Sequence, residues 1–266
     1  MSTGARNLNS DLDLALRLAD LADQISLKRY QALDLVIETK PDLSPVTDAD
    51  KAVESAIREE IKKSRPQDLV VGEEFGSPDS LAGKFYWVID PIDGTKNYLR
   101  GVPIWATLIA LIDPTGKVVV GAVSAPALAR RWWAADGLGA KTQFNIGTKE
   151  VKSINVSKVA KLSNASISHS DLIGWGAHKG NFLALQERIW RTRGHGDFWS
   201  HMLVAEGAVD LAVEPTLALW DMAALDIIVR EAGGKFTNII GEDGPHGGSA
   251  ISSNSLIHTE FITEIN

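Results

Sequence analysis

One segment of the sequence combines a buried strand with two carboxylates at its end. The apolar run 85–89 leads directly into Asp90, and Asp93 follows three residues later, before Gly94 and Thr95. Carboxylates repel one another and lose hydration when they are buried, so such a pair requires a compensating charge. Carboxylate oxygens suit a hard cation such as Mg²⁺, and the N–H groups of the Gly-Thr step suit an anion. The segment therefore predicts a site for metal and phosphate.

The composition limits the class of protein. The chain has 266 residues, of which 44% are hydrophobic and 23% charged, which is typical of a globular protein with one large domain or two packed lobes. A net charge of −7 argues against binding to nucleic acid. With no long apolar run and no signal pattern at the N-terminus, we expect no membrane segment and a cytoplasmic protein. The absence of cysteine excludes disulfides and thiolate ligands and fits a reducing compartment.

The first half of the chain predicts helices followed by an antiparallel sheet. A Ser10-x-x-Asp13 cap predicts the start of one helix, and Thr47-Asp-Ala-Asp50 predicts the start of another, after a polar loop over 38–47. Alternating and apolar patterns around turn residues predict strands and two hairpins. The expected strands cover 69–71 and 85–89, and the expected hairpins cover 105–123 and 131–145.

The second half alternates helix and strand, which is typical of an α/β unit. We expect strands over 165–168, 191–193 and 209–213, and helices over 181–190, 200–208, 222–232 and 256–265. The sequence therefore predicts an N-terminal α+β lobe over 1–146, which carries most of the metal ligands. A C-terminal α/β lobe over 147–266 is expected to carry the substrate-selecting residues and Asp221.

Two other motifs can be excluded by counting. An EF-hand loop that starts at Asp90 needs an acid at its twelfth position, which is Gly101. Phosphatases with an aspartyl nucleophile need that aspartate two residues before Asp93, where this chain has Pro91. The remaining interpretation is a metal site in which water is the nucleophile and no covalent intermediate forms. The other acids at predicted element ends, including Asp50 and Asp221, each have an alternative role in capping a helix.

Together these motifs identify a resemblance. The run from Asp90 to Thr95, with Gly72-Glu-Glu74 before it and Trp220-Asp-x-Ala-Ala224 after it, resembles the inositol monophosphatase family. The resemblance covers nearly the whole chain. It implies a two-lobed layered αβαβα sandwich like that of inositol monophosphatase and fructose-1,6-bisphosphatase. It also implies Mg²⁺-dependent hydrolysis of small phosphate monoesters and a homodimer.

The matching positions imply specific roles. Glu73, Asp90 and the carbonyl of Ile92 would hold a first Mg²⁺, and Asp90, Asp93 and Asp221 a second. A third ion could bind near Glu73, so that each active site would hold two or three. The resemblance further implies that Gly94 and Thr95 bind the phosphate, that Thr95, backed by Asp50, acts with Glu73 on the attacking water, and that Lys40 lies on a mobile loop.

The leaving group depends on other residues. After the strand at 191–193 this chain has Gly194-His-Gly-Asp197 where inositol phosphatases have small residues, and Glu214 matches a family position that contacts substrate. Two carboxylates suit a cationic alcohol, and the pattern resembles the histidinol-phosphatase branch, an activity of histidine biosynthesis. Asp197 could instead cap the helix that follows it. The candidate substrate residues are Arg193, His195, Asp197 and Glu214.

Two alternatives stay open. One is an inositol-1-monophosphatase or a broad-specificity sugar phosphatase. The other is a metal- or phosphoinositide-sensing module without turnover, against which stands the presence of Glu73, Thr95 and Asp50, because a pure binder would need only the ligands. Whether the enzyme acts on histidinol phosphate or on another ester, the expected partner is a small phosphate ester rather than nucleic acid or a membrane.

Overall fold

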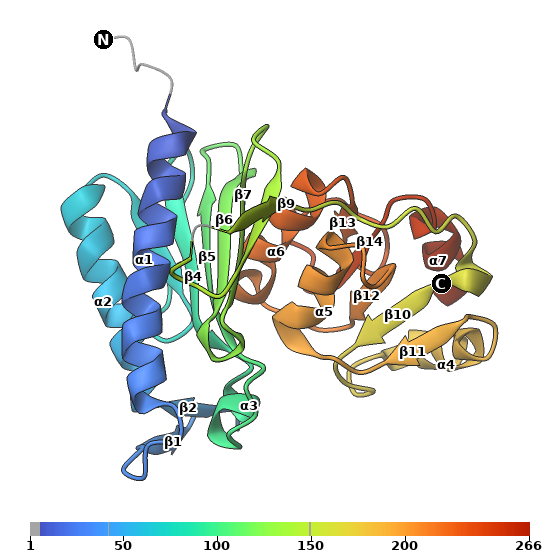
Figure 1. The fold of residues 1–266 in the computed structure, drawn as a ribbon, viewed down its shortest axis with the longest axis horizontal. Coiled ribbons are helices and arrows are strands. Elements are labelled where there is room, and N and C mark those ends of the chain that lie inside the picture. Colours follow the sequence, from blue (N-terminus) through green and yellow to red (C-terminus); the bar gives the residue numbers. More distant parts are fainter. Residues whose placement is uncertain (1–5, 42, 149) are drawn as a thin grey trace.

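The computed structural model describes residues 6–41, 43–148 and 150–266, so that Asp42 in the expected 38–47 loop lies outside the described residues. The elements form five layers in the order αβαβα (Figure 1). Helices α1 and α2 cover the outer face of a seven-stranded sheet, α5 and α6 lie between this sheet and a five-stranded sheet, and α4 and α7 cover the far face. This is the layered sandwich that the resemblance implied. The helices are α1 (Leu8–Arg29), α2 (Asp48–Ser64), α3 (Thr95–Leu99), α4 (Lys179–Gln186), α5 (Asp197–Ala205), α6 (Leu219–Glu231) and α7 (His258–Ile265).

The seven-stranded sheet has the order β3-β4-β5-β6-β7-β8-β9. Neighbouring strands are antiparallel except for the parallel pair β3–β4. The two predicted hairpins are present as β5–β6 and β7–β8, and β9 extends this sheet to Ser153. Its strands are β3 (Leu69–Gly72), β4 (Tyr86–Asp93), β5 (Ala106–Ile112), β6 (Val118–Ala125), β7 (Arg130–Ala135), β8 (Ala140–Phe144) and β9 (Val151–Ser153).

The five-stranded sheet has the order β11-β10-β12-β14-β13 and is mixed. Strand β10 pairs in parallel with β11 and β12, whereas β14 is antiparallel to β12 and β13. The short β1 (Ile37–Thr39) and β2 (Pro45–Thr47) pair with each other beside α3, so the expected polar loop over 38–47 is in part a hairpin. The remaining strands are β10 (Ser166–His169), β11 (Arg191–Arg193), β12 (Leu211–Glu214), β13 (Lys235–Thr237) and β14 (Ala250–Ser253).

Helix starts follow the expected chemistry with one correction. The side chain of Thr47 accepts hydrogen bonds at the start of α2 while Asp50 bonds back to the N–H of Thr47, which confirms the predicted capping box. Helix α1 begins earlier than expected. Its cap is Asn7, whose Oδ1 accepts from the N–H groups of Asn9 and Ser10. The Ser10 cap was wrong because the side chain of Asn7 already satisfies the first free N–H groups.

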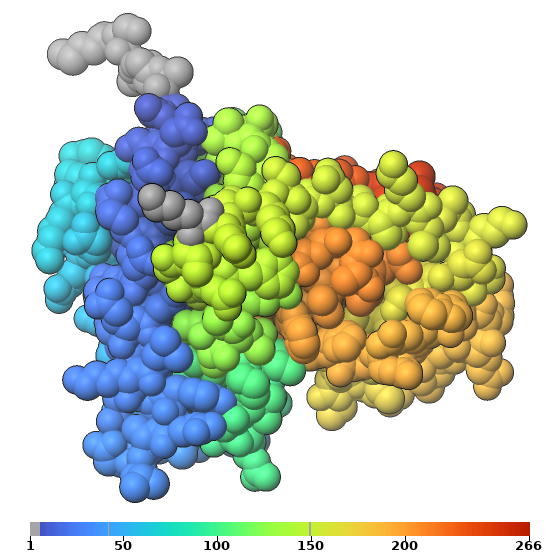
Figure 2. Space-filling view, in the orientation of Figure 1, coloured from blue at the N-terminus to red at the C-terminus, as the bar shows by residue number. Residues whose placement is uncertain are grey.

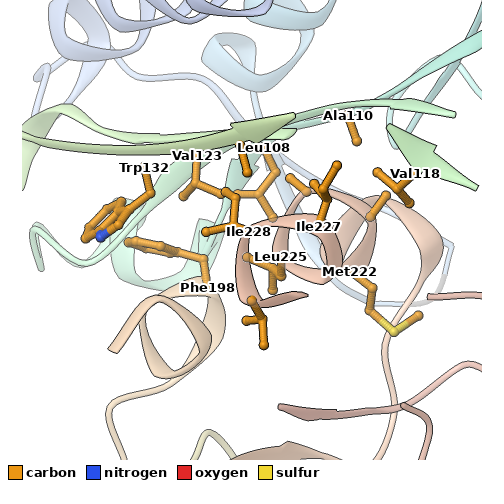
Figure 3. Close-up of a cluster of buried hydrophobic side chains, with 14 of the residues drawn as sticks. Leu108, Ala110, Val118, Val123, Trp132, Phe198, Met222, Leu225, Ile227 and Ile228 are labelled. Atoms are coloured by element: carbon orange, nitrogen blue, oxygen red, sulfur yellow. The ribbon is translucent and has the colours of Figure 1, made fainter. Parts of the chain in front are cut away.

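The core between the two sheets joins the two halves of the chain. Apolar residues of β5, β6 and β7 pack against α6 and the start of α5 (Figure 3). Helix α6 lies so close to β6 that a Cβ at Gly121 would be 2.5 Å from Ile227 Cγ2 and 2.8 Å from the carbonyl oxygen of Ala224. Glycine at this position therefore sets the spacing of the two layers. Among the described residues, no helix is both long and apolar enough to cross a membrane.

Candidate active site

Three carboxylates meet where β4 ends and α6 begins. Asp90 and Asp93 lie on either side of an irregularity in the β4–β5 pairing, which brings both to one edge of the sheet, and Asp221 lies in the first turn of α6. One carboxylate oxygen from each of the three lies within 4.8 Å of the others. Two segments that are more than a hundred residues apart in sequence thus supply one acidic cluster.

The electrostatics of this cluster favour a bound cation. Burial, together with the charges of Glu73 and the other acids, raises the pKa of Asp90 well above its usual value, and burial raises that of Asp93 in the same way. Burial raises the pKa of Asp221 to about 6. In the described part of the chain, no lysine or arginine forms an ion pair with any of the three. A set of carboxylate oxygens without a basic partner fits a hard divalent cation.

Backbone groups fix each of the three side chains. Asp90 Oδ1 accepts the N–H of Ile92 at 3.0 Å, and Asp221 Oδ2 accepts the N–H of Ala218 at 2.7 Å. Asp93 Oδ2 accepts the N–H of Phe198 at 2.9 Å, at the start of α5 in the other half of the chain. One oxygen of each carboxylate is therefore held by the fold, and Asp93 ties the two lobes together.

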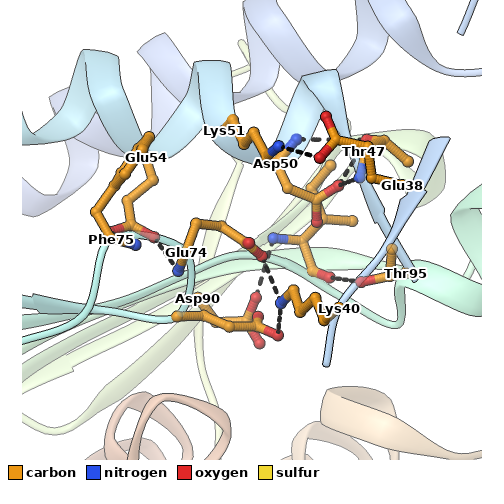
Figure 4. A network of polar contacts seen from close by, with 12 residues as sticks. Glu38, Lys40, Thr47, Asp50, Lys51, Glu54, Glu74, Phe75, Asp90 and Thr95 are labelled. Carbon is orange, nitrogen blue, oxygen red and sulfur yellow. Dashed lines mark hydrogen bonds and ion pairs between the residues drawn. The ribbon is translucent and has the colours of Figure 1, made fainter. Parts of the chain in front are cut away.

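Glu73 lies beside this cluster and contacts the predicted loop lysine. Lys40 Nζ lies 2.6 Å from Glu73 Oε1 and 2.7 Å from Glu74 Oε1 (Figure 4). Burial raises the pKa of Glu74 to about 7. The β1–β2 hairpin therefore places the ammonium group of Lys40 against two of the acids.

Sequence reasoning missed the residue that shapes the Glu73–Glu74 turn. Glu54 is fully buried in α2, where its Oε2 accepts the N–H of Glu74 at 2.7 Å and its Oε1 accepts the N–H of Phe75 at 3.2 Å (Figure 4). Arg58, one helical turn later, neutralises Glu54 at 2.7 Å. A signal was available, because Glu54 lies among the apolar positions of a helix whose exposed face is already charged.

Thr95 and Asp50 do not form the pair that was expected. The hydroxyl of Thr95 donates to the carbonyl of Ile92 at 3.0 Å, whereas Asp50 Oδ2 accepts from the N–H of Thr47 at 2.8 Å and from its hydroxyl at 2.6 Å (Figure 4). Burial raises the pKa of Asp50 to about 6. The capping box of α2 thus occupies Oδ2 of Asp50, whereas its Oδ1 has no hydrogen-bond partner among the described residues.

An open pocket of about 500 Å³ adjoins the acidic cluster. Gly94, Thr95 and Asn97 line it from one lobe, and Asp197 and Glu214 from the other, so it lies in the hollow between the green and the yellow-to-orange segments in Figure 2. Gly94 has a positive φ of 83°, and a Cβ there would lie 3.0 Å from the carbonyl of Ile104. Glycine thus permits the turn that presents the N–H groups at the start of α3.

Three acids line the pocket from the second lobe, namely the exposed Asp171 and the less exposed Asp197 and Glu214. Asp197, the first residue of α5, has a positive φ of 47° and accepts a hydrogen bond from Asn97 Nδ2 at 3.0 Å. Burial raises the pKa of Glu214 to about 8, and its Oε2 accepts from the hydroxyl of Ser170. Sequence reasoning missed Asn97 and Ser170 because neither belongs to a local pattern that names its partner.

The other two candidate substrate residues differ in position. His195 lines the pocket with its ring against that of Trp199, at a centroid distance of 5.4 Å. Arg193 lies on the edge strand β11, outside the pocket, and its guanidinium donates to the carbonyl of Thr192 at 2.7 Å. Gly194, the next residue, does line the pocket, so a role for Arg193 toward the substrate stays a prediction.

Comparison with known proteins decides the family. The model of the inositol monophosphatase family matches residues 7–266. The chain belongs to the inositol monophosphatase family. It is 54% identical over 260 residues to the histidinol-phosphatase of Mycobacterium tuberculosis, covering 97% of this chain and 98% of that protein. It is 52% identical over 261 residues to the histidinol-phosphatase of Streptomyces coelicolor, covering 96% and 97%. The structure of the Thermotoga maritima IMPase matches with a TM-score of 0.84 at 30% identity, covering 97% of each chain.

Membership of the inositol monophosphatase family gives the geometry a chemical meaning. The family acts on phosphate esters and depends on metal, and the acidic cluster of Asp90, Asp93 and Asp221 is the group of side chains with the required donors. The neighbouring pocket is lined by Glu73, Gly94 and Thr95 from one lobe and by Asp197 and Glu214 from the other. The expected phosphatase class and its fold are confirmed.

Proposed function

We propose that the protein is a Mg²⁺-dependent histidinol-phosphatase, which converts L-histidinol phosphate and water into L-histidinol and phosphate. The observation that carries this proposal is the pair of carboxylates, the half-buried Asp197 and the buried Glu214, that line a pocket beside the acidic cluster. Histidinol presents an amine and an imidazole, both of which can donate hydrogen bonds to carboxylates. The names of the relatives from Mycobacterium tuberculosis and Streptomyces coelicolor point the same way.

The proposal assigns the metal ligands by position. Glu73, Asp90 and the carbonyl of Ile92 would hold one Mg²⁺, and Asp90, Asp93 and Asp221 a second, with a third ion possible beside Glu73. Such ions, when bound, neutralise the charge of the ester, acidify a water molecule and stabilise the leaving alkoxide. The side-chain oxygens within 4.8 Å of one another support the second set.

The chain's own residues would orient the reactants. Gly94 and Thr95 line the pocket, and their N–H groups would bind the phosphate oxygens. The hydroxyl of Thr95 and the carboxylate of Glu73 would align the attacking water and take up its proton. Asp50 would act one step removed, because its contacts hold Thr47 and thereby the start of α2 beside the hairpin that carries Lys40.

The runner-up is an inositol-1-monophosphatase or a broad-specificity sugar phosphatase. The open pocket of about 500 Å³ and its polar lining favour this alternative, because they could also admit a polyol. A metal- or phosphoinositide-sensing module without turnover is the non-enzymatic alternative. Glu73 and Thr95 argue against this alternative. Both line the pocket in addition to the three clustered acids, and a pure binder would need only the metal ligands. The proposal further includes a homodimer in the cytoplasm.

Release of inorganic phosphate from a panel of esters tests the proposal. The panel contains histidinol phosphate, inositol 1-phosphate, fructose 1,6-bisphosphate and adenosine 3′,5′-bisphosphate, each with Mg²⁺ and with a chelator. We expect kcat/KM to be highest for histidinol phosphate by a large factor and turnover to stop with the chelator. A preference for inositol 1-phosphate would replace the proposed substrate, and binding of the esters without turnover would favour the sensing module.

A further inference from the structure

A second, much smaller cavity lies behind the pocket, between α5 and the active-site acids. It has a volume of about 30 Å³, and Asp197, His201 and Glu214 contribute to its wall together with Asp93 and Asp221, two of the proposed metal ligands. Two buried atoms of these residues have no hydrogen-bond partner among the described residues, namely His201 Nε2 and Glu214 Oε1. Buried polar atoms are nearly always satisfied by protein or by ordered water, so two such atoms on one small cavity require an explanation.

The protonation of His201 can be inferred from its surroundings. The side chain is 1% exposed, and burial lowers its pKa to about 3, so the ring is neutral. Its Nδ1 lies 2.6 Å from the hydroxyl of Ser252, which has no other hydrogen-bond partner in the described part of the chain. The hydroxyl of Ser252 is satisfied if it donates to Nδ1, and the proton of the ring then resides on Nε2. His201 therefore offers an N–H donor at the cavity.

Glu214 offers the complementary group. It is the last residue of β12 and is 3% exposed. Its Oε2 is used by Ser170, which leaves Oε1 as an acceptor on the cavity. One donor and one acceptor on a polar cavity match a water molecule, which needs two to four polar partners and roughly 10–15 Å³. The volume of about 30 Å³ meets that requirement for one water.

We infer that one ordered water in this cavity accepts a hydrogen bond from His201 Nε2 and donates one to Glu214 Oε1, which makes His201 a positioning residue for leaving-group recognition. The second hydrogen of the water can be donated to Asp197 or Asp221, whose carboxylates contribute to the same wall. A continuous series of hydrogen bonds then runs from Ser252 through His201 and the water to Glu214 and Ser170. This inference rests on the proposed function for the role of Glu214, but the water itself does not depend on it.

Steady-state kinetics on two esters test the role of His201. His201→Leu removes the donor and keeps the site apolar, and we expect it to raise KM for histidinol phosphate about tenfold, the equivalent of one hydrogen bond of about 1.4 kcal/mol. The kcat for 4-nitrophenyl phosphate, whose alcohol lacks an amine, should stay within about twofold, since the metal ligands are untouched. His201→Gln restores a donor and should recover most of the lost affinity.

A matched control separates this effect from general destabilisation. His258 is also 1% exposed in the same lobe, with its two ring nitrogens 2.7 Å from Ser253 and 3.0 Å from Thr237, but it does not line the cavity. His258→Leu should lower the melting temperature without changing the ratio of kcat/KM for the two esters. In the background of Glu214→Gln, His201→Leu should add little further loss, because both changes act through one group.

Crystal structures decide the inference directly. The wild-type protein should show one water within hydrogen-bonding distance of both His201 Nε2 and Glu214 Oε1, and His201→Leu should lose it. Absence of that water, or equal losses on both esters in His201→Leu, overturns the inference. Failure of the proposed function is a different result, in which the wild-type protein prefers another ester; the density for the water is then the remaining test of the inference.

Discussion

The acidic cluster at one end of the site and the Asp197–Glu214 pair at the other both contain buried or half-buried carboxylates, but the two sets are held in different ways. Asp90, Asp93 and Asp221 each accept a backbone N–H, from Ile92, Phe198 and Ala218. Asp197 and Glu214 accept instead from side chains, those of Asn97 and Ser170. Backbone donors persist whatever the neighbouring side chains are, whereas a side-chain donor is lost with a single substitution. The reaction is thus fixed by the fold, and selectivity can change while the reaction is kept.

The largest effect is expected at the backbone-held end. Asp93→Asn removes one charge from the cluster while keeping an oxygen for the N–H of Phe198. A bound metal contributes several kcal/mol of charge stabilisation, so we expect kcat to fall by about a thousandfold on every ester. Phosphate release and thermal unfolding should show lost turnover with the fold retained. Near-wild-type activity, in this variant or in the wild type with a chelator, would contradict the metal mechanism.

A smaller and selective effect is expected at the side-chain-held end. Asp197→Ala removes an acceptor for the cationic alcohol, and hydrogen bonds to charged groups contribute about 1.5–3 kcal/mol, so kcat/KM for histidinol phosphate should fall about 10- to 100-fold. The loss on 4-nitrophenyl phosphate should be far less. Asp171→Ala is the matched control, since Asp171 lies on the same pocket but is exposed. Equal losses on the two esters would leave Asp197 as a helix-capping residue.

Loss of Asn97, which donates a hydrogen bond to Asp197, should have a weaker effect of the same kind. Asn97 donates to the carbonyl of Ile104 at 2.9 Å as well as to Asp197, so it joins α3 to the other lobe. Asn97→Leu should lower kcat/KM for histidinol phosphate about fivefold, in line with one hydrogen bond of about 1 kcal/mol. The double variant with Asp197→Ala should lose less than the product of the two single losses. Independent, multiplicative losses would show that the contact does not hold Asp197 in place.

The smallest effect concerns stability rather than catalysis. Burial lowers the pKa of His258 to about 4, while the nearby charges of Lys235 and Asp243 act in opposite directions. Between about 4 and 6.5 the unfolded chain binds the extra proton, so His258 contributes stability that is lost as the pH falls below about 6.5. Between pH 7 and 5.5 the free energy of unfolding of the wild type should fall by roughly 1 kcal/mol more than that of His258→Gln, as measured by denaturant unfolding. Identical pH profiles would contradict a neutral, buried His258.

The difference between the two ends also explains what could be predicted from the sequence. Asp90, Asp93 and Asp221 stand at ends of a strand and a helix, where local patterns are informative, and the Thr47–Asp50 capping box follows from four adjacent residues. The acidic cluster could therefore be predicted from these motifs, and the order of layers from the family that they resemble.

Contacts between side chains were not predictable in this way. Asn97 is a hundred residues from Asp197, and Ser170 is 44 residues from Glu214, so that no local pattern links them. Arg193 was assigned to the substrate through the pattern around Asp197 that resembles the histidinol-phosphatase branch. In the structure it lies on the edge strand β11 and is not among the residues that line the pocket. His201 resembles an ordinary core residue of an apolar helix until its unpaired nitrogen and the small cavity are considered together.

The position of α6 has a consequence for synthesis. Strands β3 to β9 are complete once residue 153 has been made, but the inner face of their sheet is covered by a helix that ends at Glu231. On the ribosome, Leu108, Val123 and Trp132 would therefore remain without their partners while nearly eighty further residues are added. Partly synthesised chains with such exposed apolar surface are prone to aggregate. The seven-stranded sheet therefore cannot finish folding until α6 has been made. A chain released from the ribosome before that point keeps the inner face of this sheet exposed.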